Sequence, residues 1–141
     1  MGVRNSEGYM DLVPYIAIAN IDREKREETK FAFRPMVYIC APFSGDIKEN
    51  TKKAAAFAKY AYDNGCIPLT PHLLFPFMDD RNKEERALAL HMDIVLMGKC
   101  KEVWVLAERI TEGMRAEIAK AKSRRQTVRY FTSDFMEVEQ L

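Results

Sequence analysis

Residues 34–46 read RPMVYICAPFSGD, and this stretch decides the fold class. Its apolar run, residues 36–41, is continuous rather than alternating and is followed by proline, serine and glycine. A continuous run of this length is typical of a strand buried on both faces, as the inner strands of a parallel sheet are. We therefore expect residues 36–41 to form a central strand that ends in a loop at residues 41–46.

Helix and strand patterns alternate through the rest of the chain. Residues 47–65 have helical spacing and stop at Asn64-Gly65, a usual helix C-terminal signal. The three prolines of residues 66–80 allow only a brief strand at residues 66–70 and a loop. Then follow an expected helix at 82–100, a strand at 101–107, a helix at 111–125, a strand at 127–131 and a short closing helix at 133–141. The side chains expected to face inward are Ala54, Phe57, Ala58 and Ala61 in the first helix and Leu88, Met92, Val95 and Leu96 in the second.

This order predicts an α/β fold, a three-layer Rossmann-like or flavodoxin-like sandwich. Right-handed crossovers would give a parallel sheet of four to five strands with helices on both faces. Residues 1–35 read as an N-terminal helical extension and residues 36–141 as one domain. Ligands of such folds bind beyond the C-terminal ends of the strands. The loops at 41–46, 71–80 and 107–113 are therefore expected to share one cleft.

Composition limits the partners. The net charge is +1 with acids and bases intermixed, so nothing indicates binding to a nucleic acid polymer or an anionic membrane. No apolar run approaches the roughly 20 residues that span a bilayer, and the N-terminus lacks the apolar core of a signal peptide. The three cysteines are odd in number and lie in or beside apolar runs, as reduced, buried thiols do. A cytoplasmic location is expected.

Several common chemistries lack their motifs. There is no G-x-G-x-x-G after the first strand, no P-loop and no G-x-S-x-G elbow. His72 and His91 are the only histidines, and no Cys, His or Asp residues have metal-ligand spacing. We therefore expect no metal and no cofactor, which leaves carboxylates and hydroxyls to carry any chemistry.

Five segments together resemble a known family. They are VYICAPFSGD (37–46), IPLTPHLLFP (67–76), ALHMDIVLMGKCKEVWVL (89–106), ITEGMRAEIAKAK (110–122) and VRYF (128–131). In order and spacing, over about residues 36–131, they resemble the nucleoside 2-deoxyribosyltransferase superfamily, which includes the deoxynucleoside 5′-monophosphate N-glycosidases. The similarity is greatest to uncharacterised bacterial and phage members. The resemblance implies an enzyme that cleaves or exchanges an N-glycosidic bond in a nucleoside or nucleotide.

The resemblance also implies roles for residues of this chain. Glu117 takes the place of the family's nucleophile, Asp93 that of its general acid, and Tyr38 that of the tyrosine that orients the nucleophile. Gly113, one turn before Glu117, would open the approach to it. Substrate contacts are expected from Ser44, Gly45, His72, Thr111, Gly113 and Met114.

Other interpretations of these residues stay open. Without the resemblance, Glu117 reads as a solvated surface charge, Tyr38 as a core aromatic and Asp93 as an acid that faces solvent or has a partner. The chain also has Ser44 where the monophosphate glycosidases carry a phosphate-binding arginine, although Arg109 and Arg115 lie near in sequence.

The alternative functions are a nucleotide-binding or regulatory module without turnover, and an interaction protein that docks through its N-terminal helix. A homo-oligomer, a dimer or larger, is expected because the amphipathic helices leave more apolar surface than one small domain covers.

Overall fold

The computed structural model describes residues 31–139. The chain divides into two compact units, Met1–Phe33 and Arg34–Leu141, and the account below concerns the second. The expected N-terminal helix lies outside the described residues.

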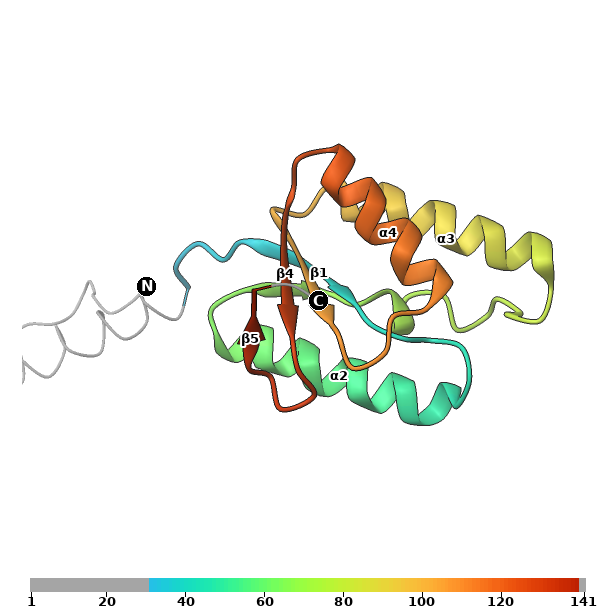
Figure 1. The fold of residues 1–141 in the computed structure, drawn as a ribbon, viewed down its shortest axis with the longest axis horizontal. Helices are drawn as coiled ribbons and strands as arrows, with labels where there is room; N and C mark the ends of the chain where they lie inside the picture. The colour runs from blue at the N-terminus through green and yellow to red at the C-terminus, as the bar shows by residue number, and fades with distance from the viewer. Residues whose placement is uncertain (1–30, 140–141) are drawn as a thin grey trace, which may run out of the picture. The chain divides into compact units, whose positions relative to one another are not determined.

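A five-stranded sheet has the strand order β2-β1-β3-β4-β5 (Figure 1). β1 (Met36–Cys40), β2 (Ile67–Leu69), β3 (Glu102–Leu106) and β4 (Thr127–Phe131) are parallel, and β5 (Glu137–Val138) pairs antiparallel with β4. The first four strands follow the flavodoxin-like order, in which the direction of winding reverses between β1 and β3. The predicted α/β sandwich with a largely parallel sheet is confirmed.

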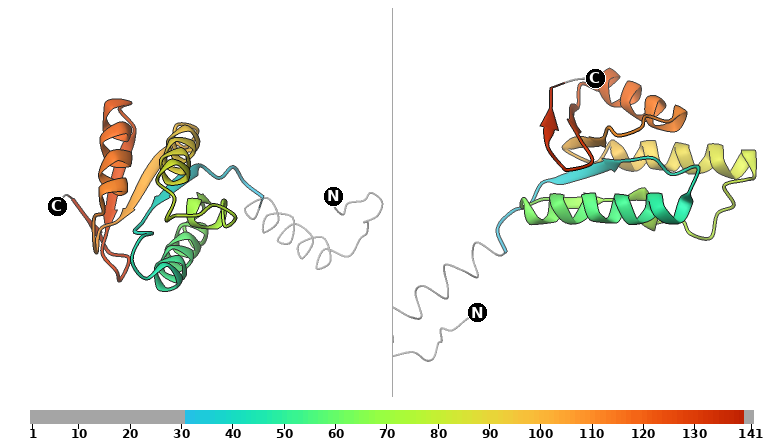
Figure 2. Two further views of the ribbon diagram at one scale, coloured as in Figure 1. Left: turned by 90° about the vertical axis from the view of Figure 1, so that its right-hand side faces the viewer. Right: turned by 60° about the horizontal axis from the view of Figure 1, so that its bottom comes forward.

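Helices cover both faces of the sheet (Figure 2). α2 (Ile47–Asp63) packs on one face, while α3 (Lys83–Met97) and α4 (Glu112–Ser123) lie on the other. This division follows from right-handed crossovers, because the chain moves one way from β1 to β2 and the opposite way from β2 to β3 and β4. The short 3-10 helix η1 (Pro71–Leu73) follows β2.

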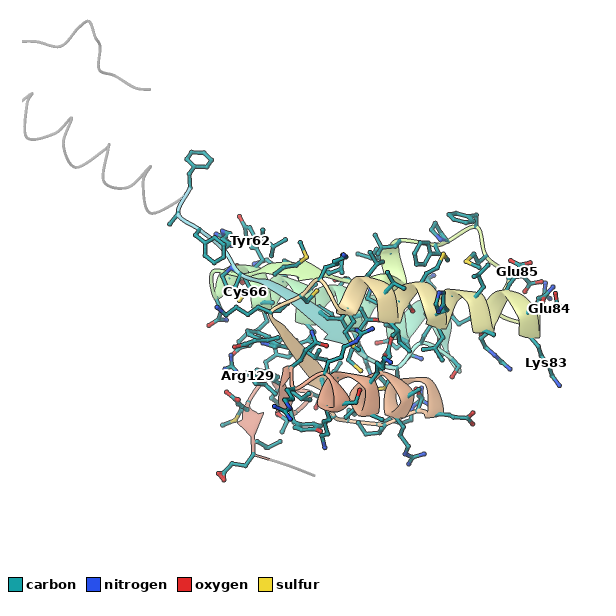
Figure 3. All side chains as sticks on the ribbon, turned by 90° about the horizontal axis from the view of Figure 1, so that it is seen from above. Tyr62, Cys66, Lys83, Glu84, Glu85 and Arg129 are labelled. Atoms are coloured by element: carbon teal, nitrogen blue, oxygen red, sulfur yellow. The ribbon has the colours of Figure 1, made fainter. Side chains whose placement is uncertain are left out.

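Polar side chains start the three helices. The Asp46 carboxylate accepts a hydrogen bond from the Glu49 amide at 3.1 Å, and Asn82 accepts from the amides of Glu84 and Glu85. Figure 3 shows Glu84 and Glu85 at the outer end of α3, with Lys83 beside them. Such caps satisfy amide donors that have no partner inside the helix.

Aromatic rings form the core between α2 and the sheet. Phe57 of α2 is fully buried, with ring centroids 5.3 Å from Phe131 and 6.3 Å from Trp104. The ring of Phe135 also packs against this cluster, with its centroid 5.5 Å from that of Phe57. The predicted inward residues Ala54, Ala58 and Ala61 are also buried here.

Two expectations for these elements are wrong, and the predicted bounds of one strand are one residue too wide at each end. Over the described residues 133–139, the predicted closing helix is instead a turn and β5, because the Thr132 amide bonds to the Met136 carbonyl and Arg129 pairs with Glu137. Figure 3 shows Arg129 next to this strand. The predicted strand 66–70 is only β2, since Thr70 already precedes η1.

The second error concerns α3. Leu88 and Val95 are 52% and 47% exposed rather than inward. Met97 is the fully buried residue of this helix, so the face of α3 that meets the sheet is rotated from the predicted one.

We expect Phe57→Ala to lower the free energy of unfolding by about 3–5 kcal/mol, because it leaves a cavity amid four aromatic neighbours. Urea unfolding measures this loss. Phe77→Ala is the control, since that ring is 79% exposed and its removal should change stability by less than about 0.5 kcal/mol. Equal effects of the two changes would contradict the assigned core.

Candidate active site

Three loops meet at the C-terminal ends of the parallel strands. His72, after β2, lies with Nε2 2.7 Å from the Pro42 carbonyl in the loop after β1. Arg109, after β3, donates a hydrogen bond of 2.8 Å to the Ser44 carbonyl in that same loop. The buried side chain of Asn50 donates to the carbonyls of Phe43 and Ser44 and so holds the loop from α2. The loop after β1 is thus fixed from three sides.

Glu117 lies at the centre of the candidate site. It is in the middle of α4, its side chain faces the sheet, and the residue is 7% exposed. The Tyr38 hydroxyl donates a hydrogen bond to Oε2, and Cys40 Sγ lies 3.3 Å from Oε1. Tyr38 and Cys40 are alternate residues of β1, so both side chains point to the α4 face of the sheet. The solvated reading of Glu117 is therefore wrong.

Asp93 of α3 is the second acid of the site. It is partly buried, and its Oδ1 has no hydrogen-bond partner among the described residues. Burial and the nearby charge of Glu117 raise the pKa of Asp93 from its ordinary value of 3.8 to about 7. Asp93 is thus half protonated near neutral pH and can give or take a proton there.

Burial dominates the electrostatics of the other groups. It raises the pKa of Glu117, while the hydrogen bonds from Tyr38 and Cys40 oppose that rise. Burial and the charge of Glu117 raise the pKa of the Tyr38 phenol and the Cys40 thiol above their ordinary values. Both groups therefore stay protonated and remain hydrogen-bond donors to the carboxylate.

The residues predicted to open or line the approach lie around the start of α4 and the loop after β1. A Cβ built on Gly113 would meet nothing within 4 Å, so the space beside this residue is open. Gly45 has φ +102°, a conformation that favours glycine, and a Cβ there would lie 3.4 Å from Arg109 Nη2. Ser44 is exposed, and its carbonyl is the acceptor for Arg109 and Asn50.

The remaining predicted contacts have structural partners. The Thr111 hydroxyl accepts from the Met114 amide at 3.2 Å and caps α4. Met114 is buried in the core, with Sδ 3.5 Å from the Thr111 amide. His72 contacts Phe43 edge-on, and burial lowers the pKa of its imidazole. Whether these three residues touch a substrate stays a prediction.

Two features of the site were missed from sequence. Cys40 was read only as a buried thiol, although the period of two in a strand places it on the same face as Tyr38. No motif in the sequence marks Asn50 as part of the site. It is a polar residue on the alanine-rich, buried side of α2. Its position beside Ala54, one turn away on that helix, was the available clue.

Within residues 31–139, no group of three His, Cys, Asp or Glu side chains could hold a metal ion. The three cysteines are free and buried, as predicted. None of the helices over the same residues is long and apolar enough to cross a bilayer.

A family model matches most of this domain. The family is described as Domain of unknown function (DUF7768), and its model matches residues 35–131. The matched part runs from the residue before β1 to the end of β4 and therefore includes Tyr38, Asp93 and Glu117. No curated protein matches the chain.

We expect Asp93→Asn to stabilise the protein at pH 8 but not at pH 4. The raised pKa means that the folded state binds more protons than the unfolded state between about pH 4 and pH 7. Stability is thus lost as pH rises through this window, and asparagine avoids the loss. After discounting for solvent screening, the gain at pH 8 is on the order of 1 kcal/mol, or roughly 4–8 °C in Tm.

Thermal unfolding at both pH values measures this effect. Asp134→Asn, which changes an exposed carboxylate in the turn before β5, is the control and should shift Tm at neither pH. Destabilisation by Asp93→Asn at pH 8 would contradict the assignment.

Proposed function

The chain belongs to the DUF7768 family, whose function is unknown, and we propose from its site that it is a nucleoside deoxyribosyltransferase-type enzyme. It cleaves or exchanges the N-glycosidic bond of a deoxynucleoside or deoxynucleotide, with Glu117 as the nucleophile. No metal and no cofactor take part. The proposal combines the resemblance of the sequence with the geometry around Glu117.

One observation carries the proposal: the buried carboxyl group of Glu117 lies close to a second, partly buried acid, Asp93, and its charge raises the pKa of Asp93. Burying an acid costs free energy, and a second acid beside it raises that cost. An apolar pair would pack in the same space without this cost. Acids in such a position are more typical of catalysis than of fold stabilisation.

The surroundings of Glu117 suit a nucleophile. Tyr38 holds one carboxylate oxygen and so limits rotation of the group. In the proposed step a Glu117 oxygen forms a bond to the anomeric carbon, and the carbon–nitrogen bond to the base breaks. The electron pair of that bond leaves with the base. Water or a second base then displaces Glu117 from the deoxyribosyl carbon.

Asp93 supplies the proton for the departing base. With a pKa of about 7, a large fraction of Asp93 is protonated at neutral pH and can donate to the base nitrogen. Its unpartnered Oδ1 leaves one oxygen free for a substrate. Asp93 is therefore the general acid in this proposal.

The position in the fold supports the same site. Tyr38 and Cys40 belong to β1, and Glu117 lies on the helix after β3. Ligands of doubly wound sheets bind where the winding reverses, which is between these two strands. In the proposal the sugar enters beside Gly113, and its 5′ end meets Ser44, Gly45 and the start of α4 at Thr111.

One observation favours the alternative of a binding module without turnover. Both oxygens of Glu117 have a donor, and the carboxylate is nearly buried, so a substrate has to displace a contact to reach it. Release of free base from any deoxynucleoside or its monophosphate decides for the enzyme. A thermal shift with a nucleoside but no base release decides for the module.

A homo-oligomer remains part of the proposal. The exposed Leu88 and Val95 lie seven residues apart on α3 and therefore on one face of that helix. Exposed apolar residues at this spacing are typical of helix-to-helix contacts between subunits.

Glu117→Gln should lower base release by roughly 10³-fold or more, because the amide keeps the shape of the side chain but is not a nucleophile. Substrate should still bind. Removing the buried charge favours folding, but the amide nitrogen cannot accept the hydrogen bond from Tyr38 or Cys40, so base release is measured at a temperature at which the variant is folded. Release of base from a panel of deoxynucleosides and their monophosphates, with and without an acceptor base, measures the effect. Glu112→Gln, at the exposed first position of α4, is the matched control and should retain activity. Near-normal base release by Glu117→Gln would overturn the assignment.

A covalent intermediate should also be detectable. Brief mixing of the wild-type protein with its substrate should add the mass of one deoxyribosyl group, or deoxyribosyl phosphate for a nucleotide, to the peptide that contains Glu117. Mass spectrometry of the quenched, digested protein locates the adduct. An adduct on Asp93 instead would reverse the two roles.

A further inference from the structure

Cys40 is a buried thiol to which the proposed reaction gives no role. It is the last residue of β1, it is fully buried, and its Sγ lies 3.3 Å from Oε1 of Glu117. The Tyr38 hydroxyl occupies the other oxygen of the same carboxylate. Two alternate residues of one strand thus hold the two oxygens of one side chain.

The other two cysteines differ from Cys40. Cys66 and Cys100 direct their thiols to backbone carbonyls, those of Asn64 and Leu96, at 3.9 and 3.7 Å. Those contacts are longer and involve no ionisable partner. Cys40 therefore makes a contact that packing alone does not explain.

We propose that Cys40 is a positioning residue for Glu117, whose thiol holds Oε1 while Tyr38 holds Oε2. The two donors together fix the plane of the carboxylate, since a group held at one oxygen can still rotate about its last bond. This inference rests on the proposed function only for its catalytic meaning. The contact itself is independent of any substrate.

The thiol acts as a donor over the whole working range of pH. Burial, together with the charge of Glu117, raises the pKa of Cys40, so the proton stays on sulfur. The hydrogen bond in turn favours the ionised form of Glu117 and lowers its pKa. Two other titratable groups lie near Glu117: Tyr38 on β1 and Asp93 on α3. The hydrogen bond from Tyr38 also lowers the pKa of Glu117. The residues that β3 presents to this side, Val103 and Val105, are apolar.

A thiol is a weak donor compared with a hydroxyl. Its loss should therefore weaken the ionisation of Glu117 without abolishing it. Cys40→Ala removes the donor, and we expect the titration midpoint of Glu117 to move to higher pH. Cys40→Ser replaces the thiol with a stronger donor, and its midpoint should lie below that of the wild type.

The test is a carbon-13 NMR titration of the full chain labelled at the glutamate carboxyl carbons. The signal that disappears in Glu117→Gln identifies Glu117. Cys100→Ala is the matched control, because Cys100 is buried in the same cluster and its thiol donates to the Leu96 carbonyl rather than to an ionisable group. It should leave the Glu117 midpoint unchanged.

The outcomes are distinct. A Glu117 midpoint in Cys40→Ala equal to that of the wild type overturns the inference, and a shift that Cys100→Ala reproduces does so as well. If one Cys40 variant does not fold, the other decides alone, since each has its own expected direction.

Activity gives a second, separate reading. If base release is found, Cys40→Ala should lower kcat on the order of fivefold at pH values below the titration midpoint of Glu117. KM should change little, and Cys40→Ser should restore kcat. A shifted midpoint with no base release from any substrate supports the contact and rejects the enzyme. Base release with an unshifted midpoint supports the enzyme and rejects the role of Cys40.

Discussion

β1 is buried on both faces, and its alternation decides what each face contains. Val37 and Ile39 point toward α2 and join an apolar core, while Tyr38 and Cys40 point the other way. On that second face the strand presents two hydrogen-bond donors to a helix. A buried donor needs an acceptor, and Glu117 supplies both of its oxygens. The site thus depends on the pleat of a single five-residue strand.

The crossovers bring distant segments to this strand. Because the winding reverses at β1, the helices before and after β3 pack on one face and place Asp93 and Glu117 near each other. The opposite face, under α2, contains the aromatic core, and there Glu102 is bonded to Trp104 and paired with Arg129. Both faces contain buried apolar residues, but the candidate site lies only on the face covered by α3 and α4.

Most of the fold was predictable because its signals are local. The continuous apolar run at β1, the Asn64-Gly65 helix end and the helical spacing of Ala54 and Phe57 each lie within one element. The face of α3 was not predictable in this way. Apolar residues occur around much of that helix, so the one that meets the sheet is set by packing against α4 and β1. The C-terminal strand was missed because its pairing depends on Arg129 and Glu137, which lie in different elements.

The candidate site was predictable only in part. The resemblance named Tyr38, Asp93 and Glu117 as one constellation, whereas periodicity alone left Glu117 on a charged, solvated helix. The contact of Cys40 with Glu117 joins residues 77 positions apart and has no local signature. Alternate residues of a strand share a face by rule, but which of them meets a carboxylate is a property of the assembled fold.

The two edges of the sheet are both very short. β2 has three residues and contains Pro68, which has no amide proton to offer a further strand. β5, the strand at the opposite edge of the sheet, has only two residues. Long, regular edges invite pairing with strands of other molecules and hence aggregation, so these blunt edges protect the parallel sheet from growing. We therefore expect any association between copies of this domain to use side-chain surfaces rather than backbone pairing.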